Sequence, residues 1–160
     1  MKNILYIAFL IGIFTSCQNK TGKFSRTVKV YENDSLKTEM QYELTISKID
    51  SGFIYNYENL SDNKKNMTFK YIKSKNRLHI HSANLGLYSV GNYSFKKTDS
   101  KEFDLFVETE LMLDGHGPVL FNEKYGVLSS DNGWGVDFLF LPTESSNEMD
   151  KEVLKNISVN

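Results

Sequence analysis

The sequence predicts a mainly β fold: a single antiparallel β-sandwich or open barrel of about eight strands, followed by one short C-terminal helix. Apolar and polar residues alternate along most of the chain, which is typical of strands that bury one face. Clusters of turn residues separate these segments at short intervals, as in antiparallel sheets. Alternating faces also argue against a parallel sheet covered on both sides.

The strongest alternation lies in the first half of the chain. In KTEMQYELTISKI (37–49), every second residue is apolar. GFIYNYEN (52–59) and NMTFKYIK (66–73) each place three large apolar residues on one face, and the turn cluster LSDNKKN lies between them. The expected core positions are Met40, Tyr42, Leu44, Ile46, Phe53, Tyr55, Tyr57, Met67, Phe69 and Tyr71.

EFDLFVETELML (102–113) alternates again. We expect Phe103, Leu105, Val107 and Leu111 to face the core and Asp104, Glu108 and Glu110 to form a solvated face. Farther along, KYGVLSS and WGVDFLFL flank DNG (131–133), whose Asn-Gly pair can supply the positive φ of a tight hairpin turn.

The period changes in SSNEMDKEVLKNI (145–157). Met149, Val153 and Ile157 are four residues apart, with Leu154 beside them, which predicts one apolar face of a helix. Ser145 and Glu148 have the spacing of a capping box. We expect about three turns of helix, lying on the sheet or closing the mouth of a barrel.

The first sixteen residues have the layout of a secretory signal peptide: a cationic start, an apolar run from Ile4 to Phe14, and small residues before the chain turns polar. The apolar run is shorter than the roughly 20 residues that a membrane span requires. The chain's only cysteine follows directly. Phe14-Thr15-Ser16-Cys17 resembles the lipobox of bacterial lipoproteins, in which leucine is usual where Phe14 stands.

This resemblance implies cleavage after Ser16 and acylation of Cys17, which would become the new N-terminus. Several acyl chains hold a protein stably at a membrane, whereas one chain does so only marginally. Since Gln18 is not the aspartate of the known inner-membrane retention signal, the resemblance implies a lipid anchor in the outer membrane, facing the periplasm. The domain organisation follows: signal peptide 1–16, lipidated N-terminus and tether 17–23, and one β-rich domain 24–160.

Composition limits the possible partners. The net charge is −1, without a basic stripe or an acidic tail, so we expect no nucleic acid as a partner. No sequence motif points to a cofactor. The expected partners are the membrane, through the anchor at Cys17, and an envelope protein or a small apolar ligand.

The three histidines offer one possible metal site. If 77–82 is a strand, His79 and His81 share a face about 6.5–7 Å apart, and His116 or Asp114 of the LDGHGP segment could complete a zinc site. The alternative is that the histidines occupy the solvated face of an amphipathic strand, opposite Leu78 and Ile80. We favour the alternative, because neighbouring lysines and Arg77 would repel a cation. The sequence therefore predicts no metal ligands.

Trp134, between Gly133 and Gly135, is the remaining candidate. A tryptophan there either covers the core or contacts a ligand or partner, and we expect the first. The surrounding FNEKYGVLSSDNGWG resembles a pattern near the end of small uncharacterised lipoproteins, which carries over no function.

These observations favour a membrane-anchored lipoprotein with a binding or envelope-maintenance role and no enzymatic activity, because no catalytic constellation is present. Two alternatives stay open. One is a lipocalin-like carrier of an apolar ligand, in a cavity lined by Tyr42, Phe53, Tyr55 and Phe69. The other is a metal-dependent hydrolase that uses His79, His81 and His116.

Overall fold

The computed structural model describes residues 22–95, 98, 101–109, 115–143 and 147–157. The signal peptide, Cys17, Asp114 and Ser145 lie outside these residues, so the predictions made for them stay predictions. The first strand begins at Gly22. Residues 22 and 23, which the sequence assigned to the tether, therefore belong to that strand.

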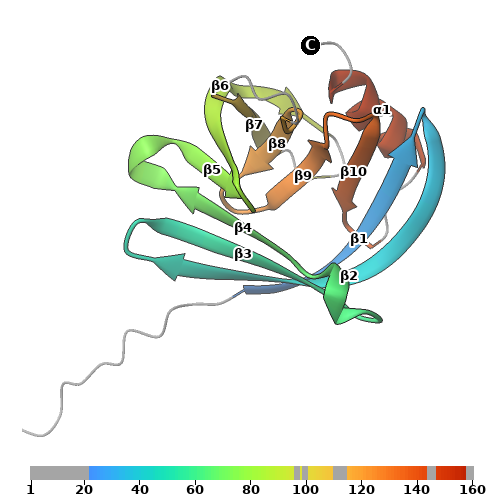
Figure 1. Ribbon diagram of the computed structural model, residues 1–160, viewed down its shortest axis with the longest axis horizontal. Helices are drawn as coiled ribbons and strands as arrows, with labels where there is room; N and C mark the ends of the chain where they lie inside the picture. The colour runs from blue at the N-terminus through green and yellow to red at the C-terminus, as the bar shows by residue number, and fades with distance from the viewer. Residues whose placement is uncertain (1–21, 96–97, 99–100, 110–114, 144–146, 158–160) are drawn as a thin grey trace, which may run out of the picture.

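The described chain consists of ten strands, two short 3-10 helices and one α-helix (Figure 1). The strands are β1 (Gly22–Glu32), β2 (Ser35–Ile49), β3 (Gly52–Asn59), β4 (Met67–Ile72), β5 (Arg77–Ile80), β6 (Ala83–Ser94), β7 (Glu102–Glu108), β8 (Val119–Asn122), β9 (Gly126–Asp131) and β10 (Val136–Leu141). The helices are η1 (Asn63–Lys65), η2 (Lys73–Lys75) and α1 (Asn147–Ile157).

Each strand pairs antiparallel with its sequence neighbour, and β1 pairs with β10, which closes the barrel. The mainly β prediction with one C-terminal helix is confirmed, but the prediction of an eight-stranded sandwich or open barrel is wrong. In the closing pair, Val28 lies opposite Phe140 and Val30 opposite Phe138. Closure joins strands from opposite ends of the chain, and β5 and β8 are only four residues long, too short to show a clear period.

The barrel interior is filled with apolar side chains at the positions that the alternation predicts in β2, β3 and β4. Aromatic rings pack edge to face there; the ring centroids of Tyr55 and Phe121, for example, are 5.2 Å apart. The buried members are Val28, Tyr42, Leu44, Tyr55, Tyr57, Phe69, Tyr71, Leu78, Ile80, Leu85, Phe106, Val119, Phe121, Val127 and Phe140.

A second core lies outside the barrel, where α1 covers the outer faces of β9 and β10. Met149, Val153, Leu154 and Ile157 are buried there, which confirms the predicted apolar face of the helix. The helix lies on the sheet and does not close a mouth of the barrel (Figure 1).

A buried ion pair also holds α1 to β1. Lys29 Nζ lies 2.7 Å from Asp150 Oδ2, and the Tyr31 hydroxyl donates a hydrogen bond of 2.8 Å to the same oxygen. Burial and the hydrogen bond to Asp150 raise the pKa of Tyr31, which therefore remains a proton donor. The carboxylate thus compensates a lysine that could not otherwise be buried.

The second core explains one wrong expectation. Phe103 and Leu105 of β7 are buried in the outer core, as apolar residues should be, but this face points away from the barrel. The other face of β7, which the sequence assigned to solvent, places Phe106 in the interior. Glu108, the last residue of β7, lies opposite Leu85 of the interior core and is therefore on the inward face of the strand. Leu111 and Glu110 lie outside the described residues.

The two ends of the barrel differ. The closed end, formed by the turns at 50–51, 73–76 and 123–125, is held by polar contacts. The Tyr55 hydroxyl donates to the Glu123 carbonyl at 2.7 Å, and Lys73 pairs with the Glu123 carboxylate at 2.8 Å. Arg26 donates to the Tyr125 carbonyl and lies 4.2 Å from the centre of the Tyr125 ring. The opposite end, formed by the turns at 33–34, 60–66, 81–82 and 132–135, is called the open end below.

Candidate functional site

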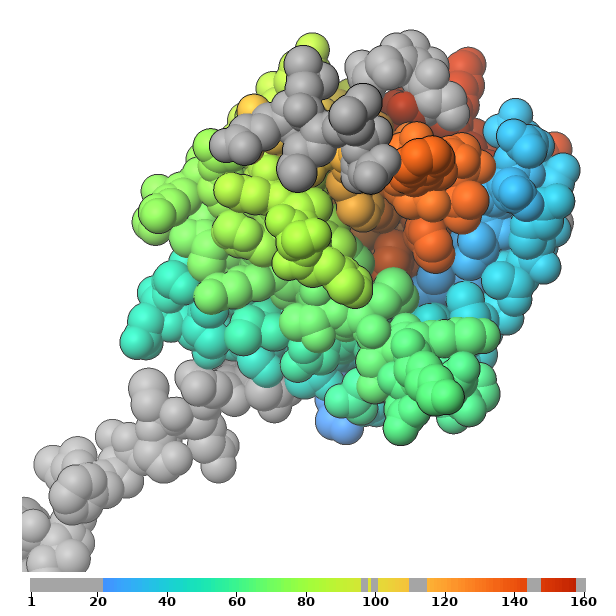
Figure 2. Space-filling model, in the orientation of Figure 1, coloured from blue at the N-terminus to red at the C-terminus, as the bar shows by residue number. Residues whose placement is uncertain are grey.

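Half-buried apolar side chains line the open end. Met40, Met67, Ala83 and Phe138 pack against the interior core without being fully buried. Met67 and Ala83 are the first inward-facing residues of β4 and β6 at this end, Phe138 is the second on β10, and Met40 lies opposite Val28 on β2. Figure 2 shows the surface hollowed here, between the green 60–67 segment, blue β1 and β2 and orange β10. The open end is therefore a shallow apolar depression.

Exposed apolar residues stand on the turns around this depression. Leu36 follows the turn at 33–34 and is 49% exposed, Leu60 in the 60–66 loop is 69% exposed, and Trp134 in the 132–135 loop is 69% exposed. The prediction that Trp134 covers the core is therefore wrong. Among the described residues, three of the six exposed large apolar side chains therefore lie on the turns of this end.

The loop that carries Trp134 has a defined conformation. The Asn132 side-chain oxygen accepts hydrogen bonds from the backbone N–H groups of Trp134, at 2.8 Å, and Val136, at 3.1 Å. Gly133 and Gly135 both have φ of +76°, so the positive φ predicted for the Asn-Gly pair is confirmed. A residue larger than glycine at 133 would meet the Gly115 carbonyl oxygen at 2.5 Å. The indole is thus exposed on a constrained turn.

Three aromatic rings close the depression from below. The ring centroids of Tyr57, Phe69 and Phe140 are 4.9 to 5.7 Å apart, and all three residues are buried. The Tyr57 hydroxyl accepts a hydrogen bond from the Val127 N–H at 3.0 Å. Burial raises the pKa of Tyr57, which keeps the hydroxyl neutral. This packing limits a ligand at the open end to a shallow position.

The deep cavity expected for a lipocalin-like carrier was assigned to Tyr42, Phe53, Tyr55 and Phe69. Tyr55 has no exposed surface and Tyr42 and Phe69 have almost none, so no water-sized space adjoins the Tyr55 side chain. Phe53 is only partly buried, at the closed end. Tyr42, Tyr55 and Phe69 therefore do not line a wide cavity in the barrel, whereas Phe53 lines a pocket of about 470 Å³ at the closed end.

Charged and polar groups also lie at the open end, among them the neighbouring carboxylates Asp34, Asp131 and Asp137. Glu108 Oε2 accepts a hydrogen bond of 2.7 Å from the backbone N–H of His116. The Asn59 side-chain oxygen holds the 60–66 loop through the N–H groups of Ser61 and Asp62, and its amide nitrogen is buried without a partner among the described residues. A ligand here would meet the apolar side chains of the depression, with carboxylates close by.

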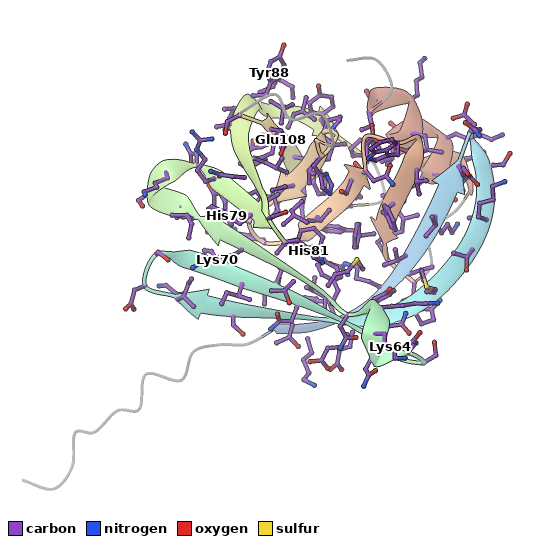
Figure 3. All side chains as sticks on the ribbon, in the orientation of Figure 1. Lys64, Lys70, His79, His81, Tyr88 and Glu108 are labelled. Atoms are coloured by element: carbon purple, nitrogen blue, oxygen red, sulfur yellow. The ribbon has the colours of Figure 1, made fainter. Side chains whose placement is uncertain are left out.

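The histidines do not assemble as the metal hypothesis requires; Figure 3 labels two of them, His79 and His81. His79 lies on β5, whereas His81 follows the strand in a turn, with the left-handed φ of 51°. The expectation that both share a strand face is therefore wrong, because the strand ends at Ile80. His116 lies in the loop before β8. Among the described residues, no three His, Cys, Asp or Glu side chains are grouped so as to hold a metal ion.

The depression itself was missed by sequence reasoning. Its residues come from strands far apart in the chain, and Met40 and Met67 simply continue the alternation of their strands. The one available signal was Leu60, a large apolar residue within the polar turn cluster LSDNKKN. Since apolar residues in turns gain no burial from local structure, such a residue is a reason to look for a surface site.

Comparisons with family models, with curated proteins and with solved structures found no match to this chain. Within the described residues, no helix has the length and apolar character needed to cross a membrane.

Proposed function

We propose that the protein is a lipid-anchored binding protein that takes a small apolar ligand at the open end of its barrel. The observation that carries the proposal is the coincidence of half-buried apolar side chains with an apolar rim at the same end. Met40 and Met67 suit such a site, because the flexible thioether side chain adapts to the shape of an apolar group. The aromatic floor limits the ligand to an alkyl chain or a ring that enters partway.

The anchor is part of this proposal. Acylation of Cys17 would hold the domain at the outer membrane, where alkyl chains are abundant. The proposal assigns no reaction to the protein.

Trp134 provides the test, because it is the only tryptophan of the chain and stands at the rim. A version beginning at Gln18 keeps every described residue and needs no detergent. Titration with decan-1-ol should shift the tryptophan emission to shorter wavelength, whereas butan-1-ol should bind far more weakly, because each buried methylene contributes about 0.8 kcal/mol. Equal response to both alcohols would contradict the proposal.

A pair of variants locates the ligand. Met67→Gln, at the open end, should weaken decan-1-ol binding about tenfold, equivalent to about 1.4 kcal/mol. Tyr88→Gln is the matched control, because Tyr88 is an exposed large side chain on β6 that is not part of the interior core. If both variants bind decan-1-ol like the parent, the open end is not the site.

The anchor is tested separately. The mature protein from membranes should have a mass that corresponds to residues 17–160 plus acyl groups, and Cys17→Ser should abolish the modification. An unmodified cysteine in the membrane-bound protein would contradict lipidation while leaving the binding site untouched.

A further inference from the structure

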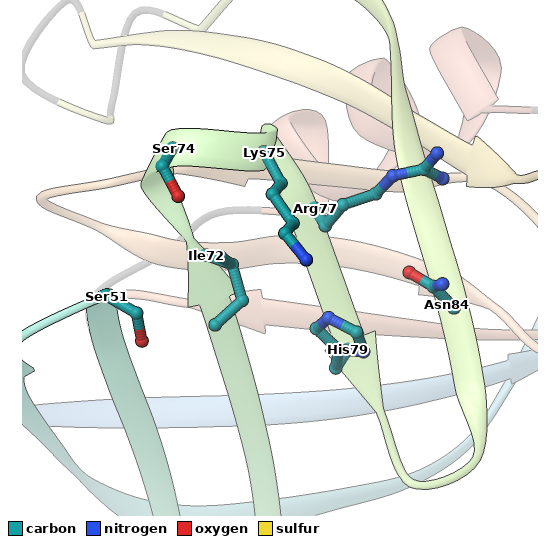
Figure 4. A pocket seen from close by; sticks show the side chains of 7 residues that line it. All are labelled: Ser51, Ile72, Ser74, Lys75, Arg77, His79 and Asn84. Carbon is teal, nitrogen blue, oxygen red and sulfur yellow. The ribbon is translucent and has the colours of Figure 1, made fainter.

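A cavity lies on the outer surface of the barrel, over the β4–β5 hairpin and the start of β6. Phe69, Tyr71, Leu78 and Ile80 of this hairpin point into the interior core. The residues between them therefore face outward, and Lys70 lies opposite His79 while Ile72 lies opposite Arg77. The cavity has a volume of about 530 Å³, and its described lining residues are Ser51, Ile72, Ser74, Lys75, Arg77, His79 and Asn84 (Figure 4).

Among the described residues, the cations that line this surface have no salt-bridge partner. Lys75, Arg77 and His79 line the cavity, Lys70 stands beside His79, and the described lining contains no carboxylate. Elsewhere in the barrel, Lys23, Lys29, Lys37 and Lys73 each lie within 4.0 Å of a carboxylate oxygen, whereas other exposed lysines such as Lys48 and Lys124 form no such pair among the described residues. Within the described residues, Lys70, Lys75 and Arg77 form no such pair. Cations gathered without a counter-charge attract an anion.

Arg77 supplies an independent observation. Its Nη1 atom is buried and has no hydrogen-bond partner among the described residues. Gly86 lies opposite Arg77 on β6, and a Cβ atom there would be 3.0 Å from Nη1. The glycine therefore leaves room for the guanidinium to lie across β6, as Figure 4 shows. A buried guanidinium donor without an acceptor is costly, and an oxyanion is its best complement.

The other lining groups indicate what carries the oxyanion. Ser51 and Ser74 contribute hydroxyl groups and Asn84 an amide, all able to hydrogen bond with ligand hydroxyls. Ile72 provides an apolar surface between them. The volume lies within the range of about 300–1,000 Å³ that is usual for small-molecule pockets. A sugar ring has the size to fill this space, and its C–H face can pack on Ile72.

We infer that this outer-surface cavity binds a sugar that carries an oxyanion, either a phosphate or a carboxylate. Arg77 and Lys75 would hold the charged group, while Ser51, Ser74 and Asn84 hydrogen bond with the ring hydroxyls. The inference does not rest on the apolar ligand proposed for the open end, since the two sites lie on different faces of the sheet.

Calorimetric titration of the full chain, kept in octaethylene glycol monododecyl ether, tests the inference. Glucose 6-phosphate and glucuronic acid are the two charged probes, and glucose is the neutral control. At least one charged probe should bind about tenfold more tightly than glucose, and the stronger one identifies the preferred oxyanion. Binding should weaken as salt approaches about 1 M, where the Debye length falls to about 3 Å. Equal affinity for glucose and both charged probes would overturn the inference.

Variants then place the site. Arg77→Gln should reduce the affinity for the preferred charged probe about tenfold, whereas Lys151→Gln, which removes an exposed lysine of α1, should leave it unchanged. Should Arg77→Gln fail to fold, Lys75→Gln on the exposed η2 turn gives the same comparison. The assignment of the cavity would be overturned if Arg77→Gln, or Lys75→Gln in its place, bound the charged probe as tightly as the parent. It would also be overturned if Lys151→Gln lost as much affinity as the cavity variant.

Discussion

The two ends of this barrel are formed by the same strands, but the side chains at the two ends make different contacts. At the closed end, side chains such as Tyr55 and Arg26 reach across to the backbone of the 123–125 turn and hold it against the core. At the open end, Met67 and Phe138 finish half-buried, and the nearby turns expose Leu60 and Trp134 to solvent. The closed end also has a pocket of about 470 Å³, lined by Phe53 and Glu123 among others, so the two ends differ chiefly in how their turns are held and in the apolar side chains that those turns expose.

The largest expected difference concerns buried volume. Tyr55→Ala at the closed end should lower the free energy of unfolding by about 3–5 kcal/mol, because it removes a fully buried ring that packs against Phe121. Met67→Ala at the open end should cost less than about 2 kcal/mol, because this side chain is only partly buried. Urea unfolding of both variants measures the difference. Equal losses would show that the open end is as important to stability as the closed end.

A smaller effect isolates the polar contact at the closed end. Tyr55→Phe keeps the ring and removes the hydroxyl that donates to the Glu123 carbonyl. We expect a loss of about 1 kcal/mol in the free energy of unfolding. Burial, and next the Glu123 carboxylate, raise the pKa of Tyr55 in the parent. Ultraviolet titration of the folded Tyr55→Phe variant should therefore show one fewer late-titrating phenol than the parent does. An unchanged stability would mean that the hydroxyl does not hold the turn.

Charge separates the ends as well. Glu123 at the closed end is paired with Lys73, whereas burial, with Asp131 and Asp34 nearby, raises the pKa of Asp137 at the open end above its usual value of 3.8. The folded state therefore holds the Asp137 proton more tightly than the unfolded state does. Its ionisation reduces stability as pH rises from below 3.8 through the raised pKa, and the penalty is constant above it.

Asp137→Asn should accordingly stabilise the protein at pH 7 by less than about 1 kcal/mol, because the group is partly solvated. The gain should disappear in acid below the usual aspartate pKa. Unfolding at a series of pH values measures this, with Asp50→Asn in the turn at 50–51 as the control. A gain that persists in acid would mean that the carboxylate charge is not its cause.

The smallest effect on stability is expected at the rim. Trp134→Ala should change the free energy of unfolding by less than about 0.5 kcal/mol, because the indole is mostly exposed. The same variant should weaken decan-1-ol binding, which can be followed by calorimetry in the absence of tryptophan. A large loss of stability would indicate that Trp134 packs against the fold and is not free to contact a ligand.

Local sequence determined the elements of this protein. The alternation of Tyr55 and Tyr57 with polar residues produces a strand with one buried face in any antiparallel sheet, and the spacing of Met149 and Val153 produces a helix with one apolar face. Both were predictable because each period depends only on backbone geometry. The positive φ of Gly133 was predictable for the same reason.

Tertiary structure decided the remaining features. Pairing of β1 with β10 closed the barrel, and packing of α1 on the outer surface made Phe103 an outward residue of β7 and Phe106 an inward one. Alternation shows that the two faces of a strand differ, but it cannot show which face meets the interior when both are covered. The depression at the open end and the cationic cavity likewise join residues of separate strands, whose proximity depends on strand order and register and not on any local pattern.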